Sequence, residues 1–140
     1  MGRSETEEAV VRVSVAVVRE GDRVLVGTRR TEPFAGLAEF PGGKCRAGES
    51  LAACAVRECR EETGLEVVPR GVLDKVRTVI AGRPTIVAFV ECVPARRTRR
   101  GVSEGRMRGT FRWVRLERLA ELTFPPANGG VVRRLLCGGR

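Results

Sequence analysis

The stretch over residues 50–63 restricts what this chain can fold into more than any other. Apolar side chains recur in it at helical spacing, and they form a stripe made of Leu51, Ala52, Ala55, Val56 and Cys59. Ser50 can cap the start of a helix here, and Gly64 stands where a helix ends in the left-handed conformation. The sequence therefore predicts a helix that packs its apolar face against a core.

Valine-rich segments on both sides of this helix predict strands that pair as hairpins. The expected strands cover residues 10–18, 23–28, 78–80, 85–93 and 111–116. We expect a short helix over 117–122, a terminal helix over 128–136, and a sharp backbone feature at 41–43, where a proline precedes two glycines. These elements predict one α+β domain over residues 1–140, with a mixed sheet between helices and a flexible N-terminal segment over 1–9.

The composition excludes several classes of site. The chain has no histidine, so a general acid or base must be Glu, Asp, Lys or Cys. Its five cysteines show no zinc-knuckle spacing, which favours reduced thiols in a cytoplasmic protein. No apolar run resembles a signal peptide or a membrane-spanning segment, so we expect no membrane partner.

The net charge of +9 comes almost entirely from arginine, because the only lysines are Lys44 and Lys75. A basic protein suits an anionic partner such as a nucleotide or a nucleic acid. A genome rich in arginine codons would give the same excess, so the charge does not choose between these explanations. With one tryptophan and no tyrosine, the chain is poorly supplied with aromatic platforms for single-stranded nucleic acid.

Three glutamates share one face of the expected helix. Glu58 precedes Glu61 by three residues and Glu62 by four, so like charges lie side by side and repel one another. Such a cluster makes physical sense when a hard divalent cation such as Mg²⁺ lies among the carboxylate oxygens. Arg57 can then orient the carboxylates without binding the cation itself. The alternative is an exposed acidic face that binds nothing.

The spacing around this cluster matches a known pattern. The matching residues are Gly43, Glu49, Arg57, Glu58, Glu61, Glu62, Gly64 and Leu65. Five residues separate the first two of them, and seven separate the second from the third. Residues 43–65 thereby resemble a complete Nudix box, in which Cys59 is the one loose fit. Residues 39–44, Glu-Phe-Pro-Gly-Gly-Lys, are similar to the entry to that box in the MutT branch of the Nudix hydrolases.

This resemblance implies a Nudix fold with α/β/α layers and hydrolysis of a diphosphate linkage, with Mg²⁺ as the cofactor and Mn²⁺ as an alternative. The implied metal ligands are Gly43, through its carbonyl, and Glu58, Glu61 and Glu62. The residues implied in catalysis are Glu49, Arg57, Glu58, Glu61 and Glu104. Of these, Glu49 would hold the loop, and Glu104 would be an additional ligand or base in a basic loop over residues 95–109. A solvated glutamate is the alternative for Glu104.

Residues 124–128, Phe-Pro-Pro-Ala-Asn, resemble the segment in which MutT proteins place an asparagine against guanine. An amide offers both a donor and an acceptor to a purine edge. Asn128 is therefore the expected base contact, with capping of the last helix as its alternative role. The other expected substrate contacts are Arg30, Glu39 and Phe40. By this resemblance the chain hydrolyses 8-oxo-dGTP, and dGTP, to the monophosphate and pyrophosphate, which prevents mutation.

Other functions stay open at this point. A Nudix hydrolase could act on CTP, dCTP or ADP-ribose instead. The arginine-rich run over residues 96–100 could serve an RNA-binding or RNA-end-processing protein, whereas a nucleotide-pool enzyme needs a small-molecule nucleotide and no stable nucleic-acid partner. A catalytically inactive scaffold is the least favoured, because every glutamate of the box is present. A monomer and a dimer both fit the sequence.

Overall fold

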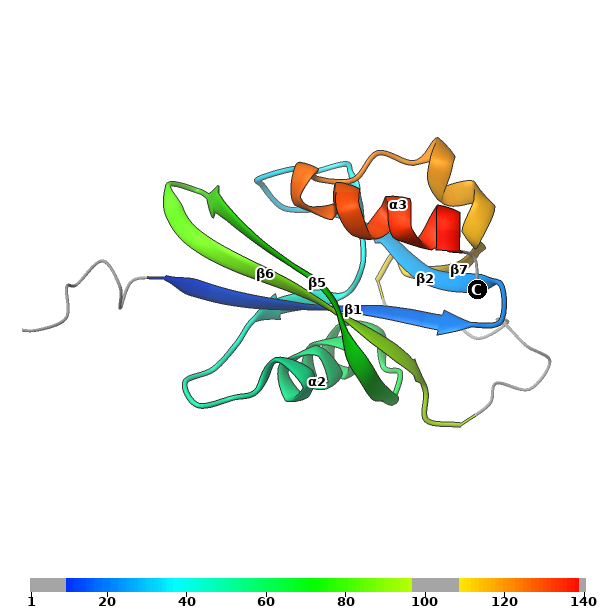
Figure 1. Ribbon diagram of the computed structural model, residues 1–140, viewed down its shortest axis with the longest axis horizontal. Coiled ribbons are helices and arrows are strands. Elements are labelled where there is room, and N and C mark those ends of the chain that lie inside the picture. Colours follow the sequence, from blue (N-terminus) through cyan, green and yellow to red (C-terminus); the bar gives the residue numbers. More distant parts are fainter. Residues whose placement is uncertain (1–9, 97–108, 139–140) are drawn as a thin grey trace, which may run out of the picture.

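A mixed β-sheet forms the centre of the protein in a computed structural model, which describes residues 10–96 and 109–138 (Figure 1). In these residues the sheet has seven strands, in the order β3-β2-β1-β6-β5, with β4 paired to β1 and β7 paired to β2. The strands are β1 (Val11–Glu20), β2 (Arg23–Thr28), β3 (Ala38–Glu39), β4 (Gly42–Lys44), β5 (Val67–Ile80), β6 (Arg83–Pro94) and β7 (Arg112–Arg115). β1 and β6 run parallel and the other pairs are antiparallel, so the predicted mixed sheet is confirmed.

Helices cover both faces of the sheet. α2 (Leu51–Thr63) lies on one face (Figure 1). The other face carries α3 (Gly129–Gly138) and the 3₁₀ helices η1 (Leu116–Glu121) and η2 (Pro126–Asn128). The expected α+β class and its α/β/α layers are thus confirmed. Within the part of the chain that the structure describes, no helix is long and apolar enough to cross a bilayer.

α2 has the boundaries and caps that its sequence predicts. The Ser50 hydroxyl accepts a hydrogen bond from the Ala53 amide at 3.0 Å. At the other end the Gly64 amide donates to the Arg60 carbonyl at 2.9 Å, from a left-handed backbone with a φ of 85°. A serine cap of this kind is worth about 1 kcal/mol relative to alanine. The residues that the helix buries are Cys54, Ala55, Cys59 and Thr63.

Alternation along the strands builds an apolar core on each face of the sheet. In β1, Val17 packs on the side of α3 and η1, whereas Ala16 and Val18 pack on the side of α2. Leu25 of β2 belongs to the α2 side as well. Successive side chains of a strand point to opposite faces, so a strand that is covered on both faces needs apolar residues at every position. This explains the unbroken apolar run in β1.

The second hairpin is longer than the sequence predicts. β5 has 14 residues, whereas the pattern predicts only a short piece at its C-terminal end. Its ladder with β6 shifts register between Pro69 and Gly71 and again between Val72 and Asp74. The strand lies at the edge of the sheet, where Val79 is 66% exposed. Bulges and an exposed edge remove the regular alternation by which a strand is detected in a sequence.

The chain bends at Pro41, within the sharp backbone feature expected at 41–43, and the two glycines that follow lie in strand β4. Gly42, Gly43 and Lys44 pair with β1 in regular antiparallel register. A Cβ on Gly42 would lie 2.6 Å from the Ser14 carbonyl oxygen and 2.8 Å from the Val15 Cα atom. Glycine is needed here because two backbones approach closely, and not because the chain turns.

The segments after the sheet differ from expectation in detail. The short helix predicted at 117–122 is the 3₁₀ helix η1, and the terminal helix α3 begins one residue after Asn128, which ends η2. The expected flexible segment 1–9 lies outside the described residues. So do residues 97–108, which contain Glu104 and most of the arginine-rich run.

Candidate active site

The glutamates of α2 lie against the backbone of β4. A Cβ on Gly43 would stand 2.5 Å from Glu58 Cδ and 2.6 and 2.7 Å from the two carboxylate oxygens. A side chain at this position would displace the Glu58 carboxylate, so glycine is what lets the carboxylate lie against the strand. The neighbouring Gly42 amide donates to Glu62 Oε1 at 3.2 Å. Helix α2 thereby brings two carboxylates against the backbone of strand β4.

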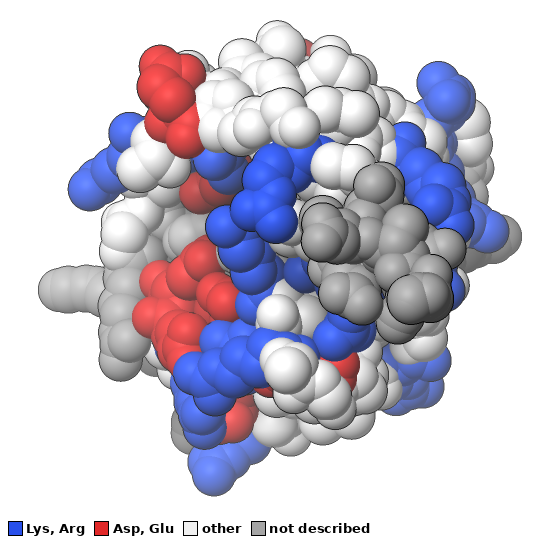
Figure 2. Space-filling model, turned by 90° about the vertical axis from the view of Figure 1, so that its left-hand side faces the viewer, with Lys and Arg blue, Asp and Glu red and all other residues white. Residues whose placement is uncertain are grey.

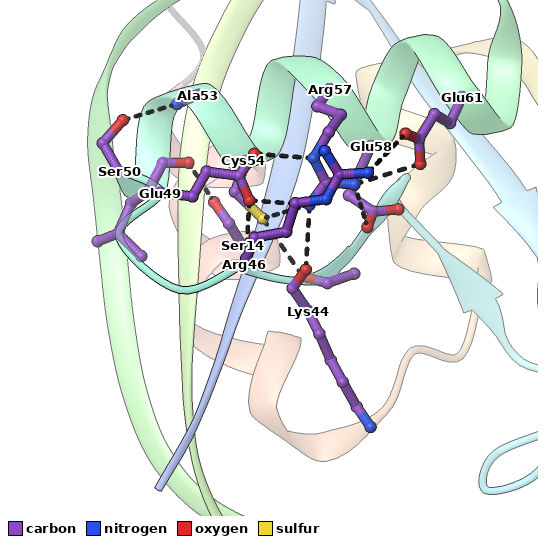
Figure 3. Close-up of polar contacts among 12 residues, drawn as sticks. Ser14, Lys44, Arg46, Glu49, Ser50, Ala53, Cys54, Arg57, Glu58 and Glu61 are labelled. Carbon is purple, nitrogen blue, oxygen red and sulfur yellow. Dashed lines mark hydrogen bonds and ion pairs between the residues drawn. The ribbon is translucent and has the colours of Figure 1, made fainter. Parts of the chain in front are cut away.

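Arg57 lies at the centre of these carboxylates (Figure 3). Its Nε and Nη2 atoms donate to the two Glu49 oxygens at 2.7 and 2.8 Å, which makes a bidentate pair. Its Nη1 atom lies 3.1 Å from Glu58 Oε2 and 3.2 Å from Glu61 Oε1. Nη2 also donates to the Lys44 carbonyl at 3.2 Å. One guanidinium therefore holds three carboxylates in place relative to one another and to β4.

The pair of Arg57 and Glu49 is shielded from water, because each side chain is 13% exposed. Hydrogen bonds from Arg57, and then from the Arg46 amide at 2.9 Å, lower the pKa of Glu49 to about 2. Glu49 is therefore ionised at neutral and mildly acidic pH, where it keeps Arg57 in position. Glu61 differs, because its side chain is 47% exposed and reaches solvent.

Glu62 lies in a different electrostatic environment. Burial has the largest effect and, together with the charges of Glu58 and Glu39, raises the pKa of Glu62 to about 8 against the lowering effect of the Gly42 amide. At pH 7 this carboxyl therefore keeps its proton. A protonated carboxyl beside a second carboxylate marks a place where a cation would replace the proton.

The oxygen atoms of this cluster suit a hard divalent cation. The oxygen groups that were predicted as ligands are the carboxylates of Glu58, Glu61 and Glu62 and the carbonyl of Gly43. Carboxylate and carbonyl oxygens are the ligands that Mg²⁺ and Mn²⁺ prefer. Over residues 10–96 and 109–138, no three acidic, histidine or cysteine side chains already stand in a coordinating arrangement. In the metal-free protein Arg57 contacts Oε2 of Glu58 and Oε1 of Glu61, and the Gly42 amide donates to Oε1 of Glu62.

Basic side chains flank the acidic ones. Figure 2 shows acidic side chains gathered in one patch of the surface, with lysine and arginine side chains at its border. Beside α2, Lys44 is exposed and Arg46 Nη2 lies 3.8 Å from Glu61 Oε2. A surface of this kind can hold a cation at its acidic centre and attract a polyanion to its rim.

A hollow of about 390 Å³ opens beside the same strand, a volume typical of small-ligand sites. The backbone of β4 forms one wall, so the hollow and the carboxylate cluster share Gly43. Phe40 is 4% exposed and stacks on Phe124, with ring centroids 4.9 Å apart. The end of β5 and residues 125–128 complete the lining. A ligand in this hollow would reach the carboxylates at the Gly43 end.

Asn128 lines this hollow and is 8% exposed. Its backbone amide donates to the Pro125 carbonyl at 2.9 Å. Its side-chain amide makes no hydrogen bond within the described part of the chain, and it forms no cap for α3. The only fully enclosed side-chain nitrogen or oxygen without a partner in the described residues is Trp113 Nε1, so the Asn128 amide borders open space. The capping alternative for Asn128 is therefore not what the structure shows.

The family model for the NUDIX domain matches residues 9–135. The chain belongs to the Nudix family. A Mycobacterium tuberculosis protein provisionally named 8-oxo-dGTP diphosphatase 2 is 36% identical over 126 residues, which are 88% of this chain and 85% of that protein. The 8-oxo-dGTP diphosphatase of Escherichia coli is 29% identical over 129 residues, 89% of this chain and 95% of that one.

Known Nudix structures share the fold. A crystal structure of a MutT protein from Methanosarcina mazei matches with a TM-score of 0.72 at 23% identity, over 94% of this chain and 96% of that one. Shorter matches join the chain to an ADP-ribose pyrophosphatase of Methanocaldococcus jannaschii, 37% identical over 49 residues, and a CTP pyrophosphohydrolase of Escherichia coli, 32% identical over 75. The chain is therefore a Nudix hydrolase that acts on pyrophosphate bonds, and its relatives differ in the substrates they are named for.

The structure places most of the predicted Nudix site residues together. The residues that meet at the carboxylate cluster are Gly43, Glu49, Arg57, Glu58, Glu61 and Glu62. Glu39 and Phe40, two of the predicted substrate contacts, line the hollow, whereas Glu104 lies outside the described residues. Arg30 is exposed and is not part of the lining.

Arg29 lines the hollow, although the sequence pointed to its neighbour. Its Nη1 atom lies 3.3 Å from Glu39 Oε1, and its Nε atom donates to the Pro33 carbonyl at 2.8 Å. Adjacent residues at the end of a strand point in opposite directions, so only the pairing of β2 with β3 decides which of two consecutive arginines faces the hollow. The end of β5, Thr78 to Ile80, was also missed as part of the lining, and no motif in the sequence marks it.

Proposed function

We propose that this Nudix hydrolase is a Mg²⁺-dependent nucleoside triphosphate pyrophosphohydrolase that cleaves 8-oxo-dGTP, and dGTP, to the monophosphate and pyrophosphate. One observation carries this proposal: the hollow lined by Asn128 ends at Gly43, against which the Glu58 carboxylate packs. A base bound near Asn128 would direct its phosphates toward the α2 carboxylates. The names of the longer-matching relatives support the same substrate.

The cluster assigns roles to the chain's own residues. We infer that Mg²⁺, or Mn²⁺ in its place, is held by Glu58, Glu61, Glu62 and the Gly43 carbonyl. Such an ion neutralises phosphate charge and lowers the pKa of a bound water. Arg57 keeps the carboxylates at a fixed spacing, and Glu49 keeps Arg57 in place. Glu104 stays a candidate for a further ligand or base.

The Asn128 amide supports the choice of a purine base. It is buried at the wall of the hollow and has no described protein partner, so its donor and its acceptor are both available to a ligand. Because the amide borders open space, the edge of a bound base can reach it. The Phe40 ring adds an apolar wall to the hollow, and Phe124 stacks on that ring.

The proposed substrate is tested by pyrophosphate release from 8-oxo-dGTP, dGTP, CTP and dCTP, with ADP-ribose followed by phosphate detection. We expect 8-oxo-dGTP to have the highest kcat/KM. Asn128→Ala should lower that value by about 30-fold, which corresponds to about 2 kcal/mol of lost hydrogen bonding. Arg133→Ala, which changes an exposed residue of α3, is the matched control and should match the wild type. Equal or faster turnover of a pyrimidine nucleotide or ADP-ribose would reject the substrate and leave the Nudix chemistry in place.

Metal binding should release a proton, because Glu62 is protonated at pH 7 when no ion is bound. We expect release of about one proton per ion at pH 7 and almost none at pH 9. Titration calorimetry with Mn²⁺ in PIPES and in Tris measures this, since the two buffers differ in ionisation heat. Glu62→Gln should abolish the buffer dependence. Identical heats for the wild type in both buffers would show that Glu62 is already ionised.

The raised pKa of Glu62 also determines how the stability of the metal-free protein depends on pH. The folded chain keeps the Glu62 proton up to a pKa of about 8, whereas the unfolded chain loses it near 4.5. This group therefore lowers the free energy of unfolding progressively as the pH rises through that interval. Added Mg²⁺ should offset the loss.

We further infer that the protein acts on free nucleotides in the cytoplasm, as a monomer or a dimer. All five cysteines are free thiols, which suits a reducing compartment. Sedimentation of the purified protein would determine its oligomeric state.

A further inference from the structure

Arg12 of β1 holds the turn that precedes α2. Its Nη2 atom donates to the Arg46 carbonyl at 3.1 Å and to the Glu49 carbonyl at 3.0 Å. Its own carbonyl accepts a hydrogen bond from the Cys45 amide at 2.8 Å. The turn closes on itself through a 3.0 Å bond from the Glu49 amide to the Arg46 carbonyl, with Gly48 at a φ of 76°. One residue outside the Nudix box thus binds this turn at three points.

The turn carries the residue that orients the catalytic arginine. Glu49 uses one carboxylate oxygen to accept from the Arg46 amide at 2.9 Å, and both oxygens to bind Arg57. Arg57 in turn contacts Glu58 and Glu61. The path from Arg12 to the carboxylate cluster therefore consists of hydrogen bonds and ion pairs of 2.7 to 3.2 Å, without a gap.

The start of α2 has a separate attachment to the same strand. The Ser14 hydroxyl donates to the Leu51 carbonyl at 2.6 Å, and Ser50 caps the helix. Loss of the Arg12 side chain would leave these bonds and the pairing of β1 with β4 intact. It would remove the side-chain donor of the Glu49 carbonyl and one of the two donors of the Arg46 carbonyl. The loss is thus confined to the turn and does not extend to the helix.

We propose that Arg12 is a positioning residue of the active site, which fixes Glu49, and through it Arg57, in the geometry that the metal-binding carboxylates require. The proposal rests on the metal-dependent function proposed above. A guanidinium suits this role, because it bears a permanent charge and can donate to two carbonyls at once. Flexibility of the turn would spread Arg57 over several positions and weaken ion binding by the carboxylates.

Mn²⁺ binding to the purified, full-length protein tests this without reference to any substrate. We expect Arg12→Ala to raise the dissociation constant for Mn²⁺, measured by electron paramagnetic resonance, by about tenfold. This is the lower end of the effect of mutating residues that hydrogen-bond to metal ligands. Hydrogen exchange of the Cys45 and Glu49 amides in the metal-free protein should accelerate in the same variant. Arg19→Ala is the matched control, since Arg19 lies on the same strand and makes no described side-chain bond.

Kinetics separate positioning from general damage. In Arg12→Ala the Mg²⁺ concentration for half-maximal activity should rise about tenfold, while the nucleotide KM at saturating Mg²⁺ stays at the wild-type value. Arg12→Lys, which keeps the charge and can reach one carbonyl, should recover part of the loss, and it also provides a folded variant if Arg12→Ala is unstable. The proposal is overturned if both variants bind Mn²⁺ like Arg19→Ala. Absence of nucleotide hydrolysis by the wild type would reject the proposed function, and the Mn²⁺ and exchange measurements would still test Arg12.

Discussion

Glutamine in place of Glu58 is expected to lower the rate of pyrophosphate release by at least about 100-fold. Mutating a residue that only supports a metal ligand costs up to about 100-fold, and a ligand itself should cost no less. The amide has nearly the same size as the carboxylate and can still accept a hydrogen bond from Arg57. It lacks the negative charge with which a carboxylate helps to balance the charge of a divalent ion. Initial rates at saturating Mg²⁺, together with a thermal melt, measure the effect on activity and on stability.

Glu66→Gln is the matched control for this change. Glu66 follows α2 closely in the sequence, but its side chain is 63% exposed and lies 3.9 Å from Arg60. An exposed ion pair of this kind contributes little to stability, so the control should keep wild-type activity. If Glu58→Gln retained more than a tenth of the wild-type rate, Glu58 would not be a metal ligand.

Gly43→Ala should inactivate the enzyme while the protein stays folded. The new methyl group would lie 2.5 Å from Glu58 Cδ, so the carboxylate has to move by about 1 Å, and a displacement of that size can cost about 100-fold in rate. The backbone itself is not strained, because Gly43 lies in the β4 ladder and has no positive φ. The kcat at saturating Mg²⁺ and the melting temperature should therefore respond differently, with a large change only in kcat.

Substitution of two other glycines tests whether the loss of activity comes from displacement of Glu58 or from replacing any glycine in the protein. Gly138→Ala adds a methyl group with no atom within 4 Å and should change neither quantity. Gly42→Ala places its methyl group 2.6 Å from the Ser14 carbonyl oxygen, which is backbone and cannot turn aside, so this variant should lose stability. An active Gly43→Ala variant would mean that Glu58 can leave β4 without consequence.

Helix α2 could be predicted almost completely from the sequence. Its caps at Ser50 and Gly64 and its apolar stripe depend on residues only a few positions apart, and local rules describe such interactions well. The shared face of Glu58, Glu61 and Glu62 could be predicted too, because all three lie in this helix a few residues apart. β2 was predicted with its observed bounds, because it is short and covered on both faces. β5 was not, because bulges and an exposed edge interrupt its alternation.

The prediction of a sharp backbone feature over residues 41–43 shows the limit of rules that use only neighbouring residues. In isolation, a proline followed by two glycines resembles a turn, since glycine relaxes the backbone. The actual requirement is space for atoms from distant parts of the chain, the Ser14 backbone at one glycine and the Glu58 carboxylate at the other. Close approach of this kind leaves no pattern in the neighbouring residues.

The sequence by itself determined the chemistry of the site, because the box places its carboxylates and Arg57 on one helix at spacings that depend only on helical geometry. Only the tertiary structure decided which residues from other parts of the chain lie around the carboxylate cluster. Sheet pairing selects Arg29 over Arg30 for the hollow and brings Arg12 to a turn more than thirty residues away along the chain. It also places Asn128 beside β4. Contacts between distant segments depend on how strands pair and layers pack, and no local pattern records them.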